Sequence, residues 1–175
     1  MKQKLSLIFV AFISAWLTRD IELLLLDNYL GWASIYGYAI VLLVIAPVFE
    51  ESIKYWGIGF SLLESNIDDM NDRNLALDTL VFAYAFQVAE AFLNGAGGEW
   101  LWYFRLILPI HVTFSLLATS KYKYSLTGAI LLHAIYNTHA LQGYGYLFWL
   151  FILINCIVFV LLIFERIIEK PIESK

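Results

Sequence analysis

Charged residues are scarce in this chain: they make up 15% of its 175 residues, whereas soluble domains usually have about 25%. Hydrophobic residues account for 61%, and the mean hydropathy is +0.73. This balance is not that of an ordinary soluble domain. It predicts an integral membrane protein in which residues 1–175 form a single domain.

The chain also has few cysteines and few basic residues, which excludes some kinds of site and partner. Cys156 is the only cysteine, which excludes an intramolecular disulfide and any metal site built from cysteines. The net charge is −4 and the sequence has no basic stripe, which argues against nucleic acid as a partner. We also find no internal repeat and no low-complexity segment.

Apolar stretches dominate what remains, and a membrane span needs about 20 mostly apolar residues. Polar, glycine-rich and basic turns divide the chain into six such stretches. We expect spans at 5–25, 34–62, 75–94, 101–119, 125–142 and 144–165. The predicted fold class is therefore all-α, a polytopic membrane helix bundle of about six helices with a polar cavity inside.

Lysine and arginine are distributed unevenly among the expected loops. The loops 26–33, 95–100 and 143–145, which six spans would place on one side, contain neither residue type. The opposite side collects Arg73, Lys121, Lys123 and the basic residues of both ends. The positive-inside rule then places both termini in the cytoplasm.

The stretch "PVFEESIKYW" (47–56) puts Glu50, Glu51 and Lys54 inside the second expected helix. Three charges at mid-membrane would cost about 8–10 kcal/mol if their costs were additive, so such groups usually face the bundle interior and pair. Lys54 lies four residues after Glu50 and three after Glu51, within reach of both. The two glutamates point about 100° apart, so one can face a cavity while the other contacts a neighbouring helix. The alternative is a purely structural ion pair.

Three later helices carry further polar residues at a comparable depth. They are Glu90 in the third helix, Arg105 and His111 in the fourth, and His133 and Asn137 in the fifth. The fourth helix also has a proline, Pro109, in mid-span. Each histidine taken alone is more typical of packing than of catalysis, but their coincidence predicts a shared polar cavity. Carboxylates and imidazoles activate water, directly or through a metal such as zinc, and an amide can donate to an oxyanion. We therefore expect hydrolysis of a peptide bond.

These motifs, in this order, resemble the PrsW family of intramembrane proteases, within the CPBP or CAAX-protease superfamily. The residues 50–54 match the motif EExxK, Phe86 to Glu90 match FxxxE, and His133 to Asn137 match HxxxN. Arg105 and His111 stand on the helix between the last two motifs, so the resemblance covers residues 46–138. The superfamily members that cut prenylated proteins carry EExxxR and FxxxH, and this chain departs from both, with Tyr55 and Glu90 at the differing positions.

The resemblance implies an intramembrane endopeptidase of a prokaryotic cell membrane. Its substrate would be a membrane-anchored protein or peptide, such as an anti-sigma factor, met within the lipid bilayer. By the same resemblance, Glu50 or Glu51 would activate the water, and His133 and Asn137 would stabilise the oxyanion. The remaining family positions would position the water or support the carboxylates: Glu90, His111, Lys54 and Arg105. Zinc held by Glu51, Glu90, His111 and His133 and a water activated without metal are both left open.

Two other classes of function stay open. Intramembrane Glu, His and Lys also relay protons in transporters, although the inverted repeat common in transporters is missing. A non-catalytic scaffold or immunity protein would use the same polar groups for packing alone. Outside the cavity, we expect Arg19, Asp20 and Glu22 to make structural pairs near the end of the first helix, and Asp72 to lie in a solvated acidic loop.

Overall fold

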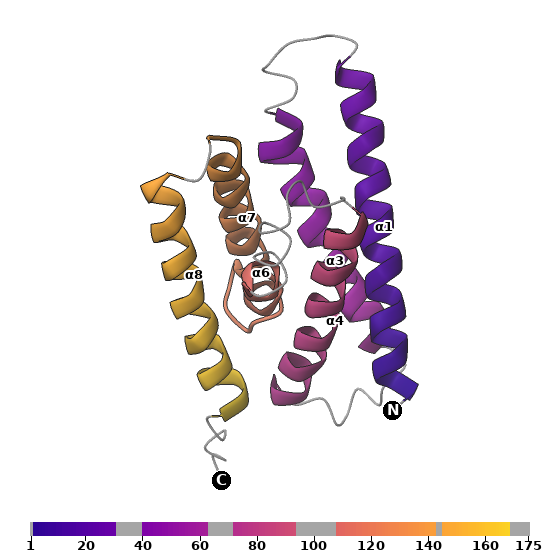
Figure 1. The fold of residues 1–175 in the computed structure, drawn as a ribbon. Helices are drawn as coiled ribbons and strands as arrows, with labels where there is room; N and C mark the ends of the chain where they lie inside the picture. Colours follow the sequence, from indigo (N-terminus) through magenta and orange to yellow (C-terminus); the bar gives the residue numbers. More distant parts are fainter. Residues whose placement is uncertain (1, 31–39, 63–71, 94–107, 143–144, 169–175) are drawn as a thin grey trace.

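The computed structural model describes residues 2–30, 40–62, 72–93, 108–142 and 145–168. These residues are predominantly helical, which confirms the all-α class for the described part of the chain. The α-helices are α1 (Lys2–Leu30), α3 (Ala46–Leu62), α4 (Asp72–Leu93), α6 (Ile110–Ala118), α7 (Ser125–Gln142) and α8 (Tyr146–Ile163) (Figure 1). Two π-helical turns extend them, η1 (Val41–Ile45) before α3 and η3 (Phe164–Ile168) after α8.

Two of the described helices are long and apolar enough to cross a membrane, Asp72–Leu93 and Tyr146–Ile168. Their mean hydropathies are 1.4 and 3.0. By contrast, α6 has 9 residues, short of the about 20 that a span needs. Two such helices are weak support for a membrane protein, and the six-span topology stays a prediction.

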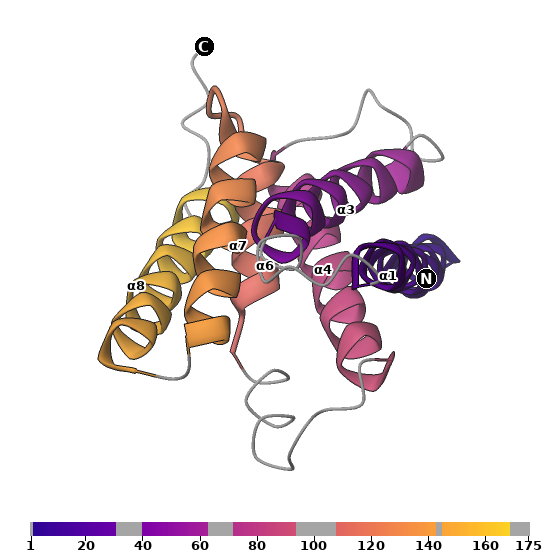
Figure 2. The same cartoon turned by 90° about the horizontal axis from the view of Figure 1, so that it is seen from above.

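The bundle has two groups of helices, with α1, α3 and α4 on one side and α6, α7 and α8 on the other (Figures 1 and 2). Within the first group, α1 packs along both α4 and α3, and within the second, α6 packs against α7 and α8. The groups meet where α4 contacts α6 and where α3 contacts α7. The beginning of α1 and the end of α8 lie at the same end of the bundle (Figure 1), as an even number of crossings would place them.

Small residues allow α1, α3 and α4 to approach closely, as is common between membrane helices. Ala11 and Ala15 of α1 are fully buried against Phe82 of α4. Gly57 of α3 is the tightest point, since a Cβ there would lie 2.8 Å from Phe82 Cζ and 3.1 Å from Ser14 Oγ. This packing brings the inner face of α3 to the centre of the bundle.

The expectation that Pro109 lies in mid-span is wrong, because Pro109 is the N-cap of α6 and the helix begins at Ile110. Proline lacks the backbone N–H of a helix interior and its ring clashes with the preceding turn, whereas a helix start tolerates it. The Pro109 carbonyl accepts hydrogen bonds from Thr113 N (2.8 Å) and from Thr113 Oγ1 (2.6 Å). Residues 101–107 of the expected span lie outside the described residues.

Candidate functional site

Four ionisable side chains from three helices meet in the interior of the bundle. They are Glu50 and Glu51 of α3, His111 of α6 and His133 of α7, called here the acid–imidazole cluster. One ligand atom of each residue lies within 4.8 Å of those of the others, and all four side chains are buried. The sequence prediction that these residues share one site is therefore supported by their geometry.

The two adjacent glutamates enter the same cluster, although their directions on α3 would also have allowed one of them to contact a neighbouring helix instead. His133 accounts for this, because its two ring nitrogens contact different carboxylates. Nδ1 lies 2.8 Å from Glu51 Oε1, and Nε2 lies 3.5 Å from Glu50 Oε2. A carboxylate can only accept a hydrogen bond when ionised, so Nδ1 of His133 donates to Glu51. The His133 imidazole thus contacts both Glu50 and Glu51, although these side chains leave α3 in directions about 100° apart.

Lys54 lies at the centre of these groups and is 1% exposed. Its Nζ is 2.5 Å from Glu50 Oε1, 2.8 Å from Glu51 Oε1 and 3.1 Å from His111 Nδ1. The ammonium also lies 4.6 Å from the centre of the Phe86 ring, within the range of a cation–π contact. His111 Nδ1 also lies 3.1 Å from Glu50 Oε1, so this nitrogen faces both the ammonium and a carboxylate.

Glu90 joins the cluster from α4. Its Oε2 lies 3.4 Å from His111 Nε2. The Glu90 side chain is 21% exposed, which makes it the most accessible acid of the site. Phe86, one turn earlier on α4, packs against Lys54, and both residues of the FxxxE motif therefore contact the site.

Asn137 is placed differently from the expectation of a free oxyanion donor. It follows His133 by one turn on α7, and its Nδ2 donates to the Leu42 carbonyl over 2.9 Å. This bond ties α7 to η1 and uses one of the two N–H bonds of the amide. Arg105, the supporting residue expected on the fourth helix, lies outside the described residues.

Sequence reasoning missed Glu22. This half-buried residue of α1 interacts electrostatically with Glu50, Glu90, His133 and Lys54 and not only with its own helix. We expected the helix to end near residue 25, which placed Glu22 at its edge, but α1 continues to Leu30. At about 1.5 Å per residue, Glu22 therefore lies about 12 Å inside the helix end. If the length of the first helix had been predicted correctly, Glu22 would have been recognised as an acid away from the helix end.

Aromatic side chains enclose the imidazoles. The ring of Phe114 stacks on that of His133, with centroids 5.5 Å apart, and the His111 and His133 rings meet edge to face at 5.1 Å. Tyr136 lies edge-on to His111 with centroids 6.0 Å apart. An apolar wall of this kind lowers the local dielectric constant and strengthens the electrostatic interactions inside it.

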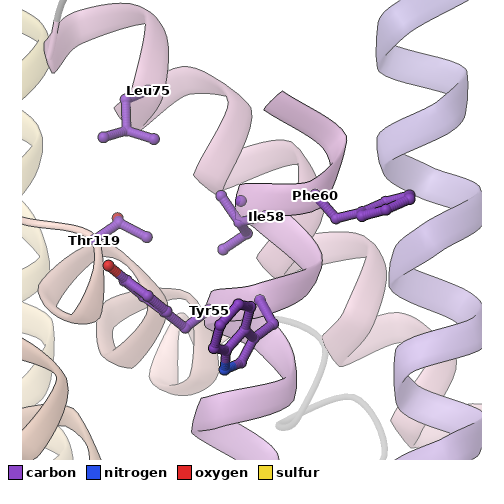
Figure 3. Close-up of a pocket in the computed structure, with 7 residues that line it drawn as sticks. Tyr55, Ile58, Phe60, Leu75 and Thr119 are labelled. Atoms are coloured by element: carbon purple, nitrogen blue, oxygen red, sulfur yellow. The ribbon is translucent and has the colours of Figure 1, made fainter. Parts of the chain in front are cut away.

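An apolar pocket lies along α3 (Figure 3). It has a volume of about 430 Å³, and its lining comes mainly from α3, with Leu75 and Thr119 closing it. A second cavity of about 340 Å³ shares Tyr55 and Thr119 with the first and is also lined by Tyr122 and Ser125. Tyr55 directly follows Lys54 in the chain, so the pocket and the cluster lie on different faces of the same helical turn.

The donor set of the cluster suits zinc, since two carboxylates and two imidazoles are common zinc ligands. The Lys54 ammonium, however, contacts donor atoms of three of the four residues at 2.5, 2.8 and 3.1 Å. A divalent ion about 3 Å from an ammonium would be repelled by roughly 11 kcal/mol at an effective dielectric constant of about 20. With Lys54 in this position, the four residues do not fit a metal ion.

Comparison with protein-family models, with curated proteins and with solved structures finds no match to this chain. The resemblance to the PrsW family thus rests on the four motifs and on their order.

Proposed function

We propose that this protein is an intramembrane endopeptidase of the PrsW type, which hydrolyses a peptide bond of a membrane-anchored protein by means of a glutamate-activated water. The observation that carries the proposal is the convergence of Glu50, Glu51, His111 and His133 from three helices on one buried point. Groups that are costly to bury individually are here collected together, as general acid–base chemistry requires.

Glu51 is the better candidate for the base. Its Oε1 contacts both Lys54 and His133, whereas its Oε2 is buried and has no hydrogen-bond partner among the described residues. A buried carboxylate oxygen without a donor is costly, and a water molecule would satisfy it. That water would give a proton to Oε2 while its oxygen attacks the scissile carbonyl carbon. The C–N bond then breaks, and the proton passes to the leaving amine.

The positive and donor groups would act on the charge that develops during the attack. The Lys54 ammonium balances the two carboxylates, and His133 is oriented by its bond to Glu51. The second amide N–H of Asn137, one turn after His133, supplies a donor for the oxyanion. In this proposal the water is activated by the carboxylate without zinc, because the Lys54 ammonium contacts the atoms that would bind the metal.

The proposed setting is a membrane with six spans and both termini in the cytoplasm. Two apolar helices of sufficient length and the shared end of α1 and α8 support this setting. The substrate would be a single-span protein whose anchor reaches the bundle through the bilayer. The apolar pocket lined mainly by α3 offers an apolar surface on the helix that carries Glu50 and Glu51.

The proposal is tested by reconstituting the full chain in liposomes with single-span anti-sigma-type proteins labelled at both ends. We expect Glu51→Gln, Glu50→Gln and His133→Ala each to reduce cleavage by at least about 100-fold. Glu165→Gln is the matched control, because Glu165 pairs with Tyr122 and Lys121 away from the cluster. Unchanged cleavage by all three folded variants would refute the proposal.

The same liposomes separate the alternative functions. Proton flux that is lost in Glu90→Gln, with no cleavage by the wild type, would indicate a transporter. A change in thermal stability in Glu50→Gln, with neither flux nor cleavage in the wild type, would indicate a scaffold.

A further inference from the structure

The contacts of Lys54 have the geometry of an ion-binding site. An ammonium has three N–H donors. Three side-chain atoms, on Glu50, Glu51 and His111, lie 2.5, 2.8 and 3.1 Å from Nζ. Nζ itself lies 4.6 Å from the centre of the Phe86 ring. The polar atoms around this buried cation therefore belong to residues that could bind a metal.

Zinc binds four ligands at about 2.0–2.3 Å in a tetrahedral arrangement. The three atoms around Nζ lie at 2.5, 2.8 and 3.1 Å, which are the distances of ion pairs and hydrogen bonds and not of coordination bonds. The fourth potential ligand, His133, is already hydrogen-bonded to Glu51 at 2.8 Å. Lys54 thus stands at the centre of a ligand set that is otherwise complete.

Removal of the Lys54 ammonium would leave the negative charges of Glu50 and Glu51 without a basic partner. Glu50 and Glu51 are both buried, and among the described residues Lys54 is the only lysine or arginine that pairs with either of them. Buried carboxylates without a counter-charge are strongly unfavourable. The buried Oε2 of Glu51 is a further oxygen with no partner among the residues described.

We propose that the Lys54 ammonium is the resident cation of this site and that its removal exposes a zinc site formed by Glu50, Glu51, His111 and His133. The wild-type protein and a zinc-loaded protein are then mutually exclusive states of one ligand set. This inference concerns cation binding alone and is measured without substrate, so it can fail or succeed independently of proteolysis.

The test compares the wild type with Lys54→Met, which keeps the length of the side chain and removes its charge. The full chain is purified without a histidine tag, freed of metal with EDTA and titrated with ZnCl2. Bound zinc is counted by mass spectrometry, and CoCl2 in a parallel titration reports tetrahedral ligation by its visible absorption. We expect one zinc per chain in Lys54→Met, with binding at least about 100-fold tighter than in the wild type.

Two further variants are matched controls. Lys54→Arg keeps the positive charge and is expected to bind no zinc. The addition of His133→Ala to Lys54→Met removes a ligand and is expected to abolish the visible cobalt spectrum.

Two results would overturn the inference. The first is zinc binding by the wild type at the affinity of Lys54→Met, lost on His133→Ala, because Lys54 would then not occupy the place of the ion. The second is a folded Lys54→Met that takes up no zinc. If Lys54→Met is unfolded without metal, zinc should restore its thermal transition, and Lys54→Gln should respond in the same way. Failure of zinc to rescue either variant would likewise overturn the inference.

Discussion

Arg166 offers a test of the fold that needs no knowledge of the function. This residue of η3 is 4% exposed and connects three segments of the chain. Its Nη2 lies 2.8 Å from Asp72 Oδ1 at the start of α4, and its Nη1 lies 2.7 Å from the Leu116 carbonyl in the last turn of α6. Nη1 and Nη2 also reach the hydroxyl and the carbonyl of Thr119. Carbonyls at a helix C-terminus lack N–H partners within the helix, and the guanidinium supplies them.

The expected cost of Arg166→Met follows from these contacts. Loss of one partner of a buried ion pair costs about 3–5 kcal/mol. The lower end applies here, because the Asp72 side chain is 43% exposed and can regain water. We therefore expect the free energy of unfolding to fall by about 3 kcal/mol. For a chain of this size, that is a decrease in Tm of about 6–12 °C.

The assay is thermal unfolding in detergent, followed by circular dichroism, at one protein concentration. Lys121→Met is the matched control, since the Lys121 side chain is 72% exposed and its Nζ lies 3.8 Å from Glu165. An exposed pair of this kind contributes about 0–1 kcal/mol. Equal shifts in Tm for Arg166→Met and Lys121→Met would refute the assignment of Arg166 as a buried connection between α4, α6 and η3.

Two further predictions concern packing and the site. Gly57→Val is expected to destabilise the fold by about 2 kcal/mol in the same unfolding assay, because its side chain would overlap Phe82. Gly59→Ala is the control: nothing lies within 4 Å of its added Cβ, and alanine favours the helix over glycine, so Tm should not fall. Glu22→Gln is expected to reduce cleavage about tenfold in the liposome assay without lowering Tm, because Glu22 interacts with the charges of the site. Asp20→Asn is its control, and equal rates for the two variants would place Glu22 outside the site.

The helices and the polar positions could be predicted because they depend on local patterns. The expected helix at 125–142 has the bounds observed for α7, since a basic turn precedes it and a glycine follows it. The first and third helices differ from their expected bounds by a few residues at each end. The spacing of Glu50, Glu51 and Lys54 correctly predicted that the lysine reaches both acids. Such contacts form within one helix and need no knowledge of its neighbours.

The contacts between distant segments could not be predicted in the same way. We expected Asp72 in a solvated loop, but it lies in the first turn of α4 and pairs with Arg166, 94 residues later. No periodicity relates these two positions. The contact between Lys54 and His111, 57 residues apart, likewise cannot be predicted from the sequence. It depends on how α6 crosses α3, and the start of α6 at Pro109 was itself misplaced.

The lysine of α3 also explains how two adjacent acids come to lie in the interior. Glu50 and Glu51 point in different directions, so a single cation on a neighbouring helix would meet only one of them well. Lys54 contacts both from within α3, at four and three residues distance, and can do so before the bundle forms. The helix therefore brings a cation of its own for its two acids into the apolar interior. His111 and His133 then add ring nitrogens that contact both carboxylates from neighbouring helices.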